Sequence, residues 1–187
     1  MVQLRSAADL MPVAEYLAGE NDGAWRHEYV NGMVYAMAGA SERHNVIKLN
    51  VAGLLNGAIP EACRVFDGDM KLEVSTENDV RFYYPDVFVS CGKHDDARHS
   101  RTDAVLIIEV LSPSTGRADR YEKFDAYKSI SSLQEYALIE QEFRRVEVFR
   151  RNNAWQREVY LPGTTVTFEC IKQTLTLDHI YRRVASE

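Results

Sequence analysis

Two carboxylates lie in segments that otherwise have the composition of buried strands, and they are the first candidates for chemistry. Glu109 is the charged residue of AVLIIEVLS (104–112), and Asp86 follows a proline in YYPDVFVS (83–90). The run around Glu109 does not alternate between apolar and polar residues, which is typical of a strand buried on both faces. Burying a lone carboxylate costs on the order of several kcal/mol or forces it to take up a proton. Glu109 therefore needs a basic partner, a hydrogen-bond network or a metal ion, whereas an ordinary solvent-facing strand position explains Asp86 equally well.

A lysine in the following segment is the third candidate. Lys123 lies in DRYEKFDAYK, four residues after Asp119, and an i,i+4 pair can orient its side chain. The aromatic residues Tyr121, Phe124 and Tyr127 predict that this segment is a helix packed on the sheet, with Lys123 over the strand ends. Two carboxylates on adjacent strands repel each other, and magnesium or manganese would relieve the repulsion. An ammonium beside them can stabilise a developing negative charge, although a solvated helix face is the alternative.

Six predicted elements have to position these residues. Their order is helix, three strands, helix and strand, over residues 42–56, 63–74, 80–90, 104–112, 118–130 and 133–140. Ser41 is suited to cap the first helix, and the first strand contains a bend or bulge at Asp67-Gly68. Pro85 marks an edge or a bulge in the second strand, and a kink there can turn Asp86 toward its neighbour. Residues 104–140 predict a parallel crossover, so the fold class is α/β (α+β), a mixed sheet flanked by helices.

Further elements are predicted on both sides of this core. Upstream, residues 7–18 are expected to form a helix, and Asn31-Gly32 between two β-prone runs is the strongest local signal for a hairpin. Downstream, residues 144–161 predict a hairpin around Asn152-Asn153. A strand near 165–169 and a short helix from about residue 177 follow it. The absence of repeats and linkers predicts one domain over residues 1–187.

Composition excludes several classes of protein. The 187 residues include 28 acidic and 22 basic side chains, and the net charge of −6 argues mildly against indiscriminate binding of nucleic acid. The three cysteines contain no CxxC pair, which predicts reduced thiols in a cytoplasmic protein and neither a disulfide framework nor a zinc site. No signal peptide or membrane span is expected. GxSxG, HExxH and P-loop motifs are absent, and His94 and His99 share a polar loop that is expected to be solvated.

Several motifs occur in an order that resembles a known superfamily. A strand with Pro-Asp, a buried strand with Glu and then a lysine resemble the PD-(D/E)xK nucleases, which have the restriction-endonuclease-like fold. YPDVFVSC, IIEVLSPST and the spacing of Asp119, Lys123 and Tyr127 look more specifically like the Uma-type family of restriction endonucleases. HEYVNGMVYAMAGASERHN and SSLQEYALIE extend the resemblance, which covers residues 12 to 181.

The resemblance implies a metal-dependent hydrolase of phosphodiester bonds. Asp86 and Glu109 would hold Mg²⁺ or Mn²⁺, and the ion would polarise a phosphoryl oxygen and lower the pKa of a bound water. The superfamily usually places its lysine two residues after the second acidic residue, where this chain has Leu111. The resemblance therefore nominates Lys123, on the following helix, as the catalytic lysine that steadies the attacking water or the transition-state charge.

Three further residues are candidates for this site, namely Glu28, His44 and Asp119. Ordinary surface positions are the alternative for Glu28 and His44. The expected partner is nucleic acid, with DNA preferred, and cleavage of both strands would favour a homodimer. The alternative function is that of a catalytically decayed nuclease-fold module that binds nucleic acid or acts as an accessory protein. Basic residues that could contact phosphates are Arg117, Arg120, Lys123, Lys128, Arg144, Arg145, Arg150 and Arg151.

Overall fold

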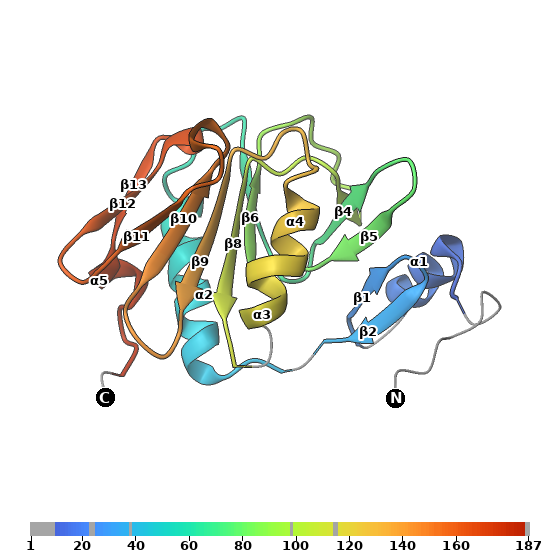
Figure 1. Ribbon diagram of the computed structural model, residues 1–187, viewed down its shortest axis with the longest axis horizontal. Helices are drawn as coiled ribbons and strands as arrows, with labels where there is room; N and C mark the ends of the chain where they lie inside the picture. The colour runs from blue at the N-terminus through green and yellow to red at the C-terminus, as the bar shows by residue number, and fades with distance from the viewer. Residues whose placement is uncertain (1–9, 23–24, 38, 98, 114–115, 186–187) are drawn as a thin grey trace.

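The computed structural model describes residues 10–22, 25–37, 39–97, 99–113 and 116–185. Its centre is a six-stranded sheet with the order β11-β10-β9-β8-β6-β3 (Figure 1). These strands are β3 (Arg64–Asp67), β6 (Val87–Ser90), β8 (Leu106–Leu111), β9 (Glu135–Glu140), β10 (Val146–Arg150) and β11 (Arg157–Tyr160). Neighbouring strands are antiparallel except for β8 and β9, which run parallel.

One helical segment connects the two parallel strands. It begins as α3 (Gly116–Ala118), continues through a π-helical turn (Asp119–Lys123) and ends as α4 (Phe124–Tyr127). We call this segment the α3–α4 helix. Together with α2 (Glu42–Asn56), the series β3, β6, β8, α3–α4 helix and β9 has the predicted order α-β-β-β-α-β. The predicted mixed sheet and its parallel crossover are therefore confirmed.

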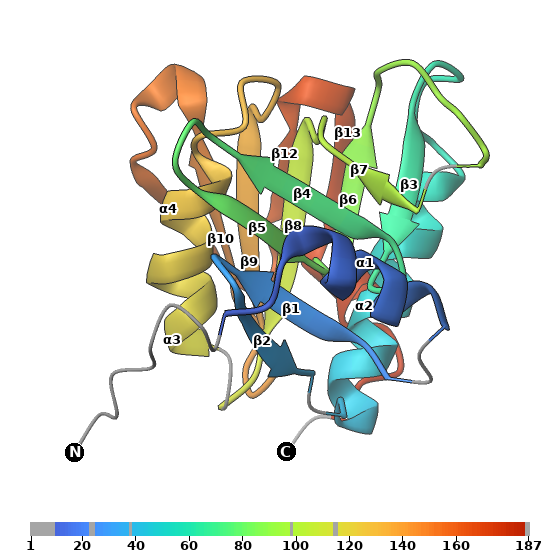
Figure 2. The ribbon, with the colours of Figure 1, turned by 90° about the vertical axis from the view of Figure 1, so that its right-hand side faces the viewer.

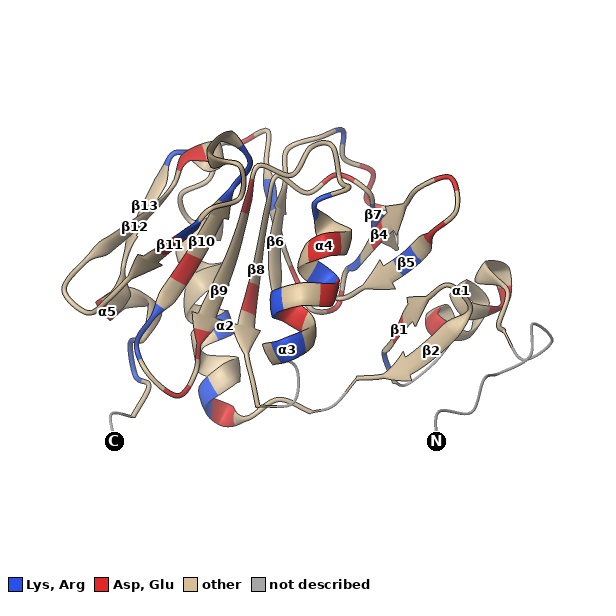
Figure 3. Cartoon of the chain, in the orientation of Figure 1, with Lys and Arg blue, Asp and Glu red and all other residues tan. Residues whose placement is uncertain are grey.

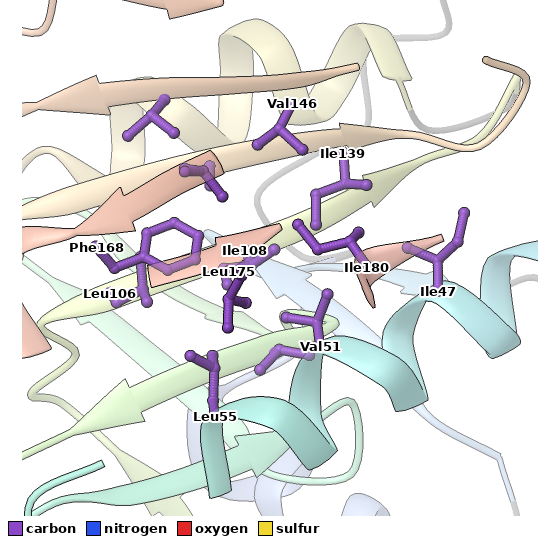
Figure 4. Close-up of a cluster of buried hydrophobic side chains, with 14 of the residues drawn as sticks. Ile47, Val51, Leu55, Leu106, Ile108, Ile139, Val146, Phe168, Leu175 and Ile180 are labelled. Atoms are coloured by element: carbon purple, nitrogen blue, oxygen red, sulfur yellow. The ribbon is translucent and has the colours of Figure 1, made fainter. Parts of the chain in front are cut away.

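The helix α2 covers one face of the central sheet. Ser41 caps it as predicted, because the hydroxyl oxygen of Ser41 accepts a hydrogen bond from the backbone N–H of His44 at 3.1 Å. The apolar side chains that α2 buries completely are Ile47, Val51 and Leu55. Figure 4 shows them against side chains of the central sheet and of the C-terminal segment. This layer fixes the direction in which the first turn of α2 approaches the sheet.

The α3–α4 helix and a second sheet cover the opposite face. Phe124 and Tyr127 pack there with Ile107 and Leu111 of β8, as the aromatic spacing predicts. Tyr121 was expected on the same apolar face, but it is 64% exposed, so this part of the prediction is wrong. The physical reason is the π-helical turn, which contains an extra residue and therefore rotates Tyr121 away from the sheet.

The second sheet has the order β2-β1-β5-β4-β7. Its strands are β1 (His27–Val30), β2 (Met33–Ala36), β4 (Lys71–Ser75), β5 (Val80–Tyr83) and β7 (Ser100–Arg101). Two segments predicted as single strands are each divided between the two sheets, which corrects the prediction for 63–74 and 80–90. The turn at Gly68 leads from β3 to β4, and Pro85, which has no N–H for a strand ladder, lies between β5 and β6.

The N-terminal elements extend this second sheet. The predicted hairpin is confirmed: β1 and β2 are antiparallel, and Asn31 and Gly32 adopt the left-handed conformation at φ 48° and 90°. Helix α1 (Val13–Asp22) begins and ends later than the predicted helix 7–18, whose residues 7–9 lie outside the described residues. Figure 2 shows α1 in front of β1, and Tyr16 of α1 packs on Tyr29.

The C-terminal part confirms the hairpin of β10 and β11. It continues with β12 (Thr165–Phe168), β13 (Gln173–Thr176) and α5 (Leu177–Ile180). The strand β13 pairs with β12 and has no counterpart among the predicted elements. Both strands lie at the edge of the molecule opposite to α1 (Figure 1).

The cysteines differ from the prediction. Cys63 and Cys91 form a disulfide, while Cys170 is free. Arg64 of β3 is paired with Ser90 of β6, so Cys63 and Cys91 are the next opposed positions of these antiparallel strands. The prediction of three reduced thiols is therefore wrong for this pair. In the part of the chain that the structure describes, no helix has both the length and the apolar character needed to cross a membrane.

Candidate functional site

Glu109 lies in the middle of β8, on the side that the α3–α4 helix covers. It is 3% exposed, which confirms the predicted burial. Its Oε1 accepts a hydrogen bond from the Tyr127 hydroxyl at 3.0 Å, and its Oε2 accepts one from the backbone N–H of Asp86 at 3.0 Å. In Figure 3 the acidic segment of β8 lies beside a helix that carries charges of both signs. Glu109 is therefore held by a hydrogen-bond network, one of the three solutions expected from its sequence position.

The carboxylate of Asp86 lies against the same strand. Its Oδ2 accepts a hydrogen bond from the backbone N–H of Val110 at 2.8 Å, while the backbone N–H of Asp86 donates to Glu109. The Nε2 atom of His44 is 3.1 Å from this Oδ2. Asp86 can turn toward β8 because it follows Pro85 in the connection between two sheets and precedes β6. The two carboxylates are thus side by side, and His44 approaches them from the first turn of α2.

Lys123 reaches the carboxylates from the α3–α4 helix. Its Nζ lies 2.7 Å from Oε1 of Glu28, 3.3 Å from Oδ1 of Asp119 and 3.9 Å from Oε1 of Glu109. Burial alone would lower the pKa of Lys123, but the carboxylates of Glu109, Glu28 and Asp119 outweigh it and raise the pKa above its ordinary value. Lys123 is therefore a positively charged ammonium at neutral pH.

Negative charge is crowded around Glu109. Burial raises the pKa of the Glu109 carboxyl well above its ordinary value. The ammonium of Lys123 lowers the same pKa, whereas the carboxylates of Asp119 and Asp86 raise it. An additional positive charge at this place would favour the ionised form of Glu109.

A cavity of about 580 Å³ opens onto these groups. Its ionisable lining residues are Glu28, His44, Lys48, Asp86, Glu109, Asp119 and Lys123, together with Tyr84. All six site residues nominated from the sequence are in this set, although they come from five separate parts of the chain. Asp119 and Lys123 both belong to the π-helical turn, an irregularity that is frequent at functional sites.

The carboxylates at the cavity are the groups that could hold a divalent cation. Within the described residues no hydrogen bond reaches the second oxygen of Asp86, Oδ1, and Asp86 lines the cavity. No group of three or more His, Cys, Asp or Glu side chains that could hold a metal ion is found among the described residues. A pair of carboxylates nevertheless fits a hard cation such as Mg²⁺, which keeps several water ligands and is often held by one or two carboxylates.

Sequence reasoning missed two polar groups of this site. The hydroxyl of Tyr127 donates to Glu109, although Tyr127 was expected only as part of an apolar face and of the motif of the family resemblance, and not as a site residue. Its position four residues after Lys123 was a usable signal, because residues four apart share a helix face. Lys48 lines the cavity and was not considered, although it lies four residues after His44 on α2.

Other residues discussed in the sequence analysis lie outside the site. Leu111, at the usual lysine position, is buried in the apolar layer next to the α3–α4 helix. Neither His94 nor His99 lines the cavity. Two of the basic residues expected to contact phosphates are engaged inside the protein: Arg150 pairs with Glu135 and Glu158, and Arg151 donates to backbone carbonyl oxygens.

Relatives in sequence extend over most of the chain. The family model described as "Uma2: Putative restriction endonuclease" matches residues 13–178. A protein of Synechocystis sp. described as uncharacterized protein slr1290 is 32% identical over 176 residues, which are 91% of this chain and 91% of that protein. A second one, uncharacterized protein sll1609, is 34% identical over 146 residues, which are 76% of this chain and 81% of that protein.

A solved structure supports the fold. The crystal structure of a protein from Anabaena variabilis, described as "a putative nuclease belonging to DUF820", matches with a TM-score of 0.70 at 16% identity. The match covers 91% of this chain and 98% of that one, and it shows the restriction-endonuclease-like architecture. Because the family model extends over most of the sequence, the chain belongs to the Uma2 family, which is described as "Putative restriction endonuclease".

Proposed function

We propose that this protein is a Mg²⁺- or Mn²⁺-dependent endonuclease that hydrolyses phosphodiester bonds in DNA. One observation carries the proposal: Asp86 and Glu109 lie side by side at a cavity, and the ammonium of Lys123 is 3.9 Å from Glu109. Carboxylates with an adjacent lysine are the chemical groups that the nuclease reaction needs. The family assignment favours the same class of reaction.

Each residue has a distinct role in this proposal. Asp86 and Glu109 would hold the divalent cation, which would supply Lewis-acid charge for a phosphate oxygen and for the attacking water. Lys123 stays protonated because its pKa is raised, so it stabilises negative charge and does not act as a general base. Glu28 and Asp119 orient its ammonium from two sides, at 2.7 and 3.3 Å. His44 orients Asp86 through the contact of 3.1 Å.

The position of the lysine on a helix is compatible with this chemistry. Residue 111 shares a face of β8 with Glu109, and Leu111 fills that place within the apolar layer. The α3–α4 helix covers the same face, so Lys123 enters the space next to Glu109 from above the sheet. A lysine from either element would bring its ammonium to the same carboxylate.

Calorimetric titration with Mn²⁺ and cleavage of plasmid DNA test the proposal together. We expect the wild type to bind Mn²⁺ and cleave DNA, and Asp86→Ala and Glu109→Ala to lose both while remaining folded. Lys123→Met should keep Mn²⁺ binding and lose roughly 10²–10³-fold in cleavage rate, as removal of one transition-state donor does. Asp125→Ala is the matched control, because Asp125 lies on the same helix with a side chain that is 74% exposed. Absence of both Mn²⁺ binding and cleavage in the wild type would favour the decayed module.

A homodimer is part of the proposal, because one site cuts one strand and two copies serve the two strands of a duplex. The strand β2 is an edge of the second sheet, and its exposed side chains include Met33 and Tyr35. Light scattering during gel filtration should give twice the chain mass of 21.3 kDa. A mass of one chain at micromolar concentration would remove the dimer from the proposal.

A further inference from the structure

Lys48 differs from the other lysine of the site cavity in having no partner among the residues that the structure describes. It lies on α2 and lines the cavity of about 580 Å³ together with Lys123. Lys123 contacts Glu28 and Asp119, whereas Lys48 has no ion pair and no hydrogen bond within the described residues. Lys48 is a half-buried residue that lines a cavity, and an ammonium without a counter-ion there is available to an anionic ligand.

The ammonium end of Lys48 can be located from its surroundings. Its Nζ is 3.7 Å from the point that a Cβ atom of residue 68 would occupy, and Gly68 also lines the cavity. Two aspartates flank Gly68, but neither holds the ammonium. Asp69 lies 3.6 Å from Arg26, and Asp67 accepts a hydrogen bond from the backbone N–H of Asp69. The ammonium of Lys48 is thus directed to the cavity, although Gly68, which lies next to it, is flanked in sequence by two aspartates.

The helix sets the distance between Lys48 and the carboxylates. Lys48 follows His44 by four residues, so both side chains project from the same face of α2, about 6 Å apart along the axis. His44 contacts Asp86, which places Lys48 one helical turn beyond the carboxylate pair. Neighbouring phosphates of a nucleic-acid strand have a comparable spacing, so a phosphate next to the scissile one can meet this ammonium.

We infer that Lys48 binds a phosphate that flanks the scissile phosphate and thereby selects a nucleic-acid strand over a single phosphodiester. The inference rests on the proposed nuclease function and adds to it a residue that contacts a second phosphate of the substrate strand. The other basic residues near the cavity have different roles. Arg43 donates to carbonyl oxygens of Gln141, Glu142 and Ala185, and Lys71 lies over the ring of Tyr84.

The first measurement is the salt dependence of DNA binding in EDTA, by fluorescence anisotropy of a labelled duplex. Lys48→Gln should reduce the slope of log K against log [salt] by about 0.9 and weaken binding roughly tenfold at 0.1 M salt, because one fewer counterion is released. Lys48→Arg should restore the slope. Lys172→Gln is the matched control, since it removes the same charge from an exposed residue of the connection between β12 and β13 and should leave the slope unchanged.

The second measurement shows whether Lys48 contacts a flanking phosphate or the scissile phosphate. Bis(4-nitrophenyl) phosphate contains a single phosphate, so Lys48→Gln should hydrolyse it at the wild-type rate while its KM for DNA rises about tenfold and kcat is kept. Equal salt slopes for wild type and Lys48→Gln would overturn the inference and leave the nuclease function standing. Equal losses on both substrates would overturn the flanking position. A wild type that neither binds nor cleaves DNA would overturn the proposed function and this inference together.

Discussion

At the scale of single residues, removal of the Tyr127 hydroxyl tests directly how Glu109 is stabilised. Tyr127→Phe removes the donor 3.0 Å from Oε1 and leaves a buried acceptor without this partner. We expect a loss of about 1–3 kcal/mol in the free energy of unfolding, measured with urea. The pKa of Glu109 should rise further, because the hydroxyl stabilises its charged form.

The nuclease pH profile distinguishes this effect from simple destabilisation. The acid limb of the Tyr127→Phe profile should move to higher pH, since more alkaline conditions are then needed to ionise Glu109. Tyr136→Phe provides the control, because the buried Tyr136 hydroxyl donates at 2.8 Å to the backbone carbonyl of Asp119 and has no bond to Glu109. Its stability should also fall while the acid limb stays in place. Identical pH profiles for the two variants would contradict the role given to Tyr127.

Glu109 should also make the stability of the protein depend on pH. Its pKa is raised in the folded state from the ordinary value of 4.5, mainly by burial. Between 4.5 and the raised pKa the folded state binds more protons than the unfolded state, so stability falls as pH increases. Relative to Glu109→Gln, the wild type should therefore lose free energy of unfolding on going from pH 4.5 upward. Urea titrations of both proteins in metal-free buffer measure the difference, and a difference that grows in the opposite direction would refute the raised pKa.

The sequence predicts some site residues better than others. The burial of Glu109 follows from a local signal, the apolar run without alternation. The contacts of Asp86 with His44 and Val110 depend on the packing of three elements that are remote in sequence. For Lys48 the only local signal is its position four residues after His44, and this signal is weak because a lysine on a helix is ordinarily solvated.

At the scale of elements, the N-terminus of α2 connects helix stability to the site. The hydroxyl of Ser41 accepts from the N–H of His44 at 3.1 Å and donates to Oε1 of Gln141 at 2.8 Å. Ser41→Ala should cost about 1 kcal/mol in the free energy of unfolding, the usual value for a lost N-cap. It should also lower nuclease activity several-fold, because His44 then orients Asp86 less firmly.

A second cap of the same kind serves as the control for Ser41. Thr176 caps α5 by accepting from the N–H of His179 at 3.1 Å, and neither residue lines the site cavity. Thr176→Ala should lose a similar free energy in urea denaturation while its specific activity per folded molecule is unchanged. Ser41→Thr, which keeps a capping hydroxyl, should restore both properties. A similar loss of activity in Ser41→Ala and Thr176→Ala would mean that only global stability matters.

The elements themselves show where local patterns suffice and where they fail. The hairpin at Asn31-Gly32 and the start of α2 at Ser41 are encoded by turn and cap chemistry, and both are confirmed. The segments 63–74 and 80–90 have continuous β-type composition, yet each is divided between two sheets. Gly68 and Pro85 mark the places, but whether such residues bulge a strand or end it depends on which partner strands are available.

At the scale of the whole molecule, two sheets and two helices have to meet for the site to exist, and α2 brings His44 to it. The second sheet supplies Glu28, the central sheet supplies Glu109, and the α3–α4 helix supplies Lys123 between them. Separate core clusters lie on the two sides of the central sheet. The half-buried ion pair of Lys123 and Glu28, at 2.7 Å, therefore joins layers that are otherwise held by apolar packing.

The disulfide is expected to stabilise the whole folded protein. It joins Cys63 and Cys91, which are 28 residues apart, and it fastens the edge strand β3 to β6. The chain-entropy model gives about 3–4 kcal/mol for a closed loop of this length, because the link restricts the unfolded chain. We therefore expect a reductant to lower the free energy of unfolding of the wild type by about this amount in urea, with little change for a Cys63→Ala/Cys91→Ala variant. Cys170→Ser keeps the disulfide and should respond to the reductant as the wild type does. If the wild type is insensitive to reductant, the link makes no contribution, and the ladder between β3 and β6 alone must hold the edge of the central sheet.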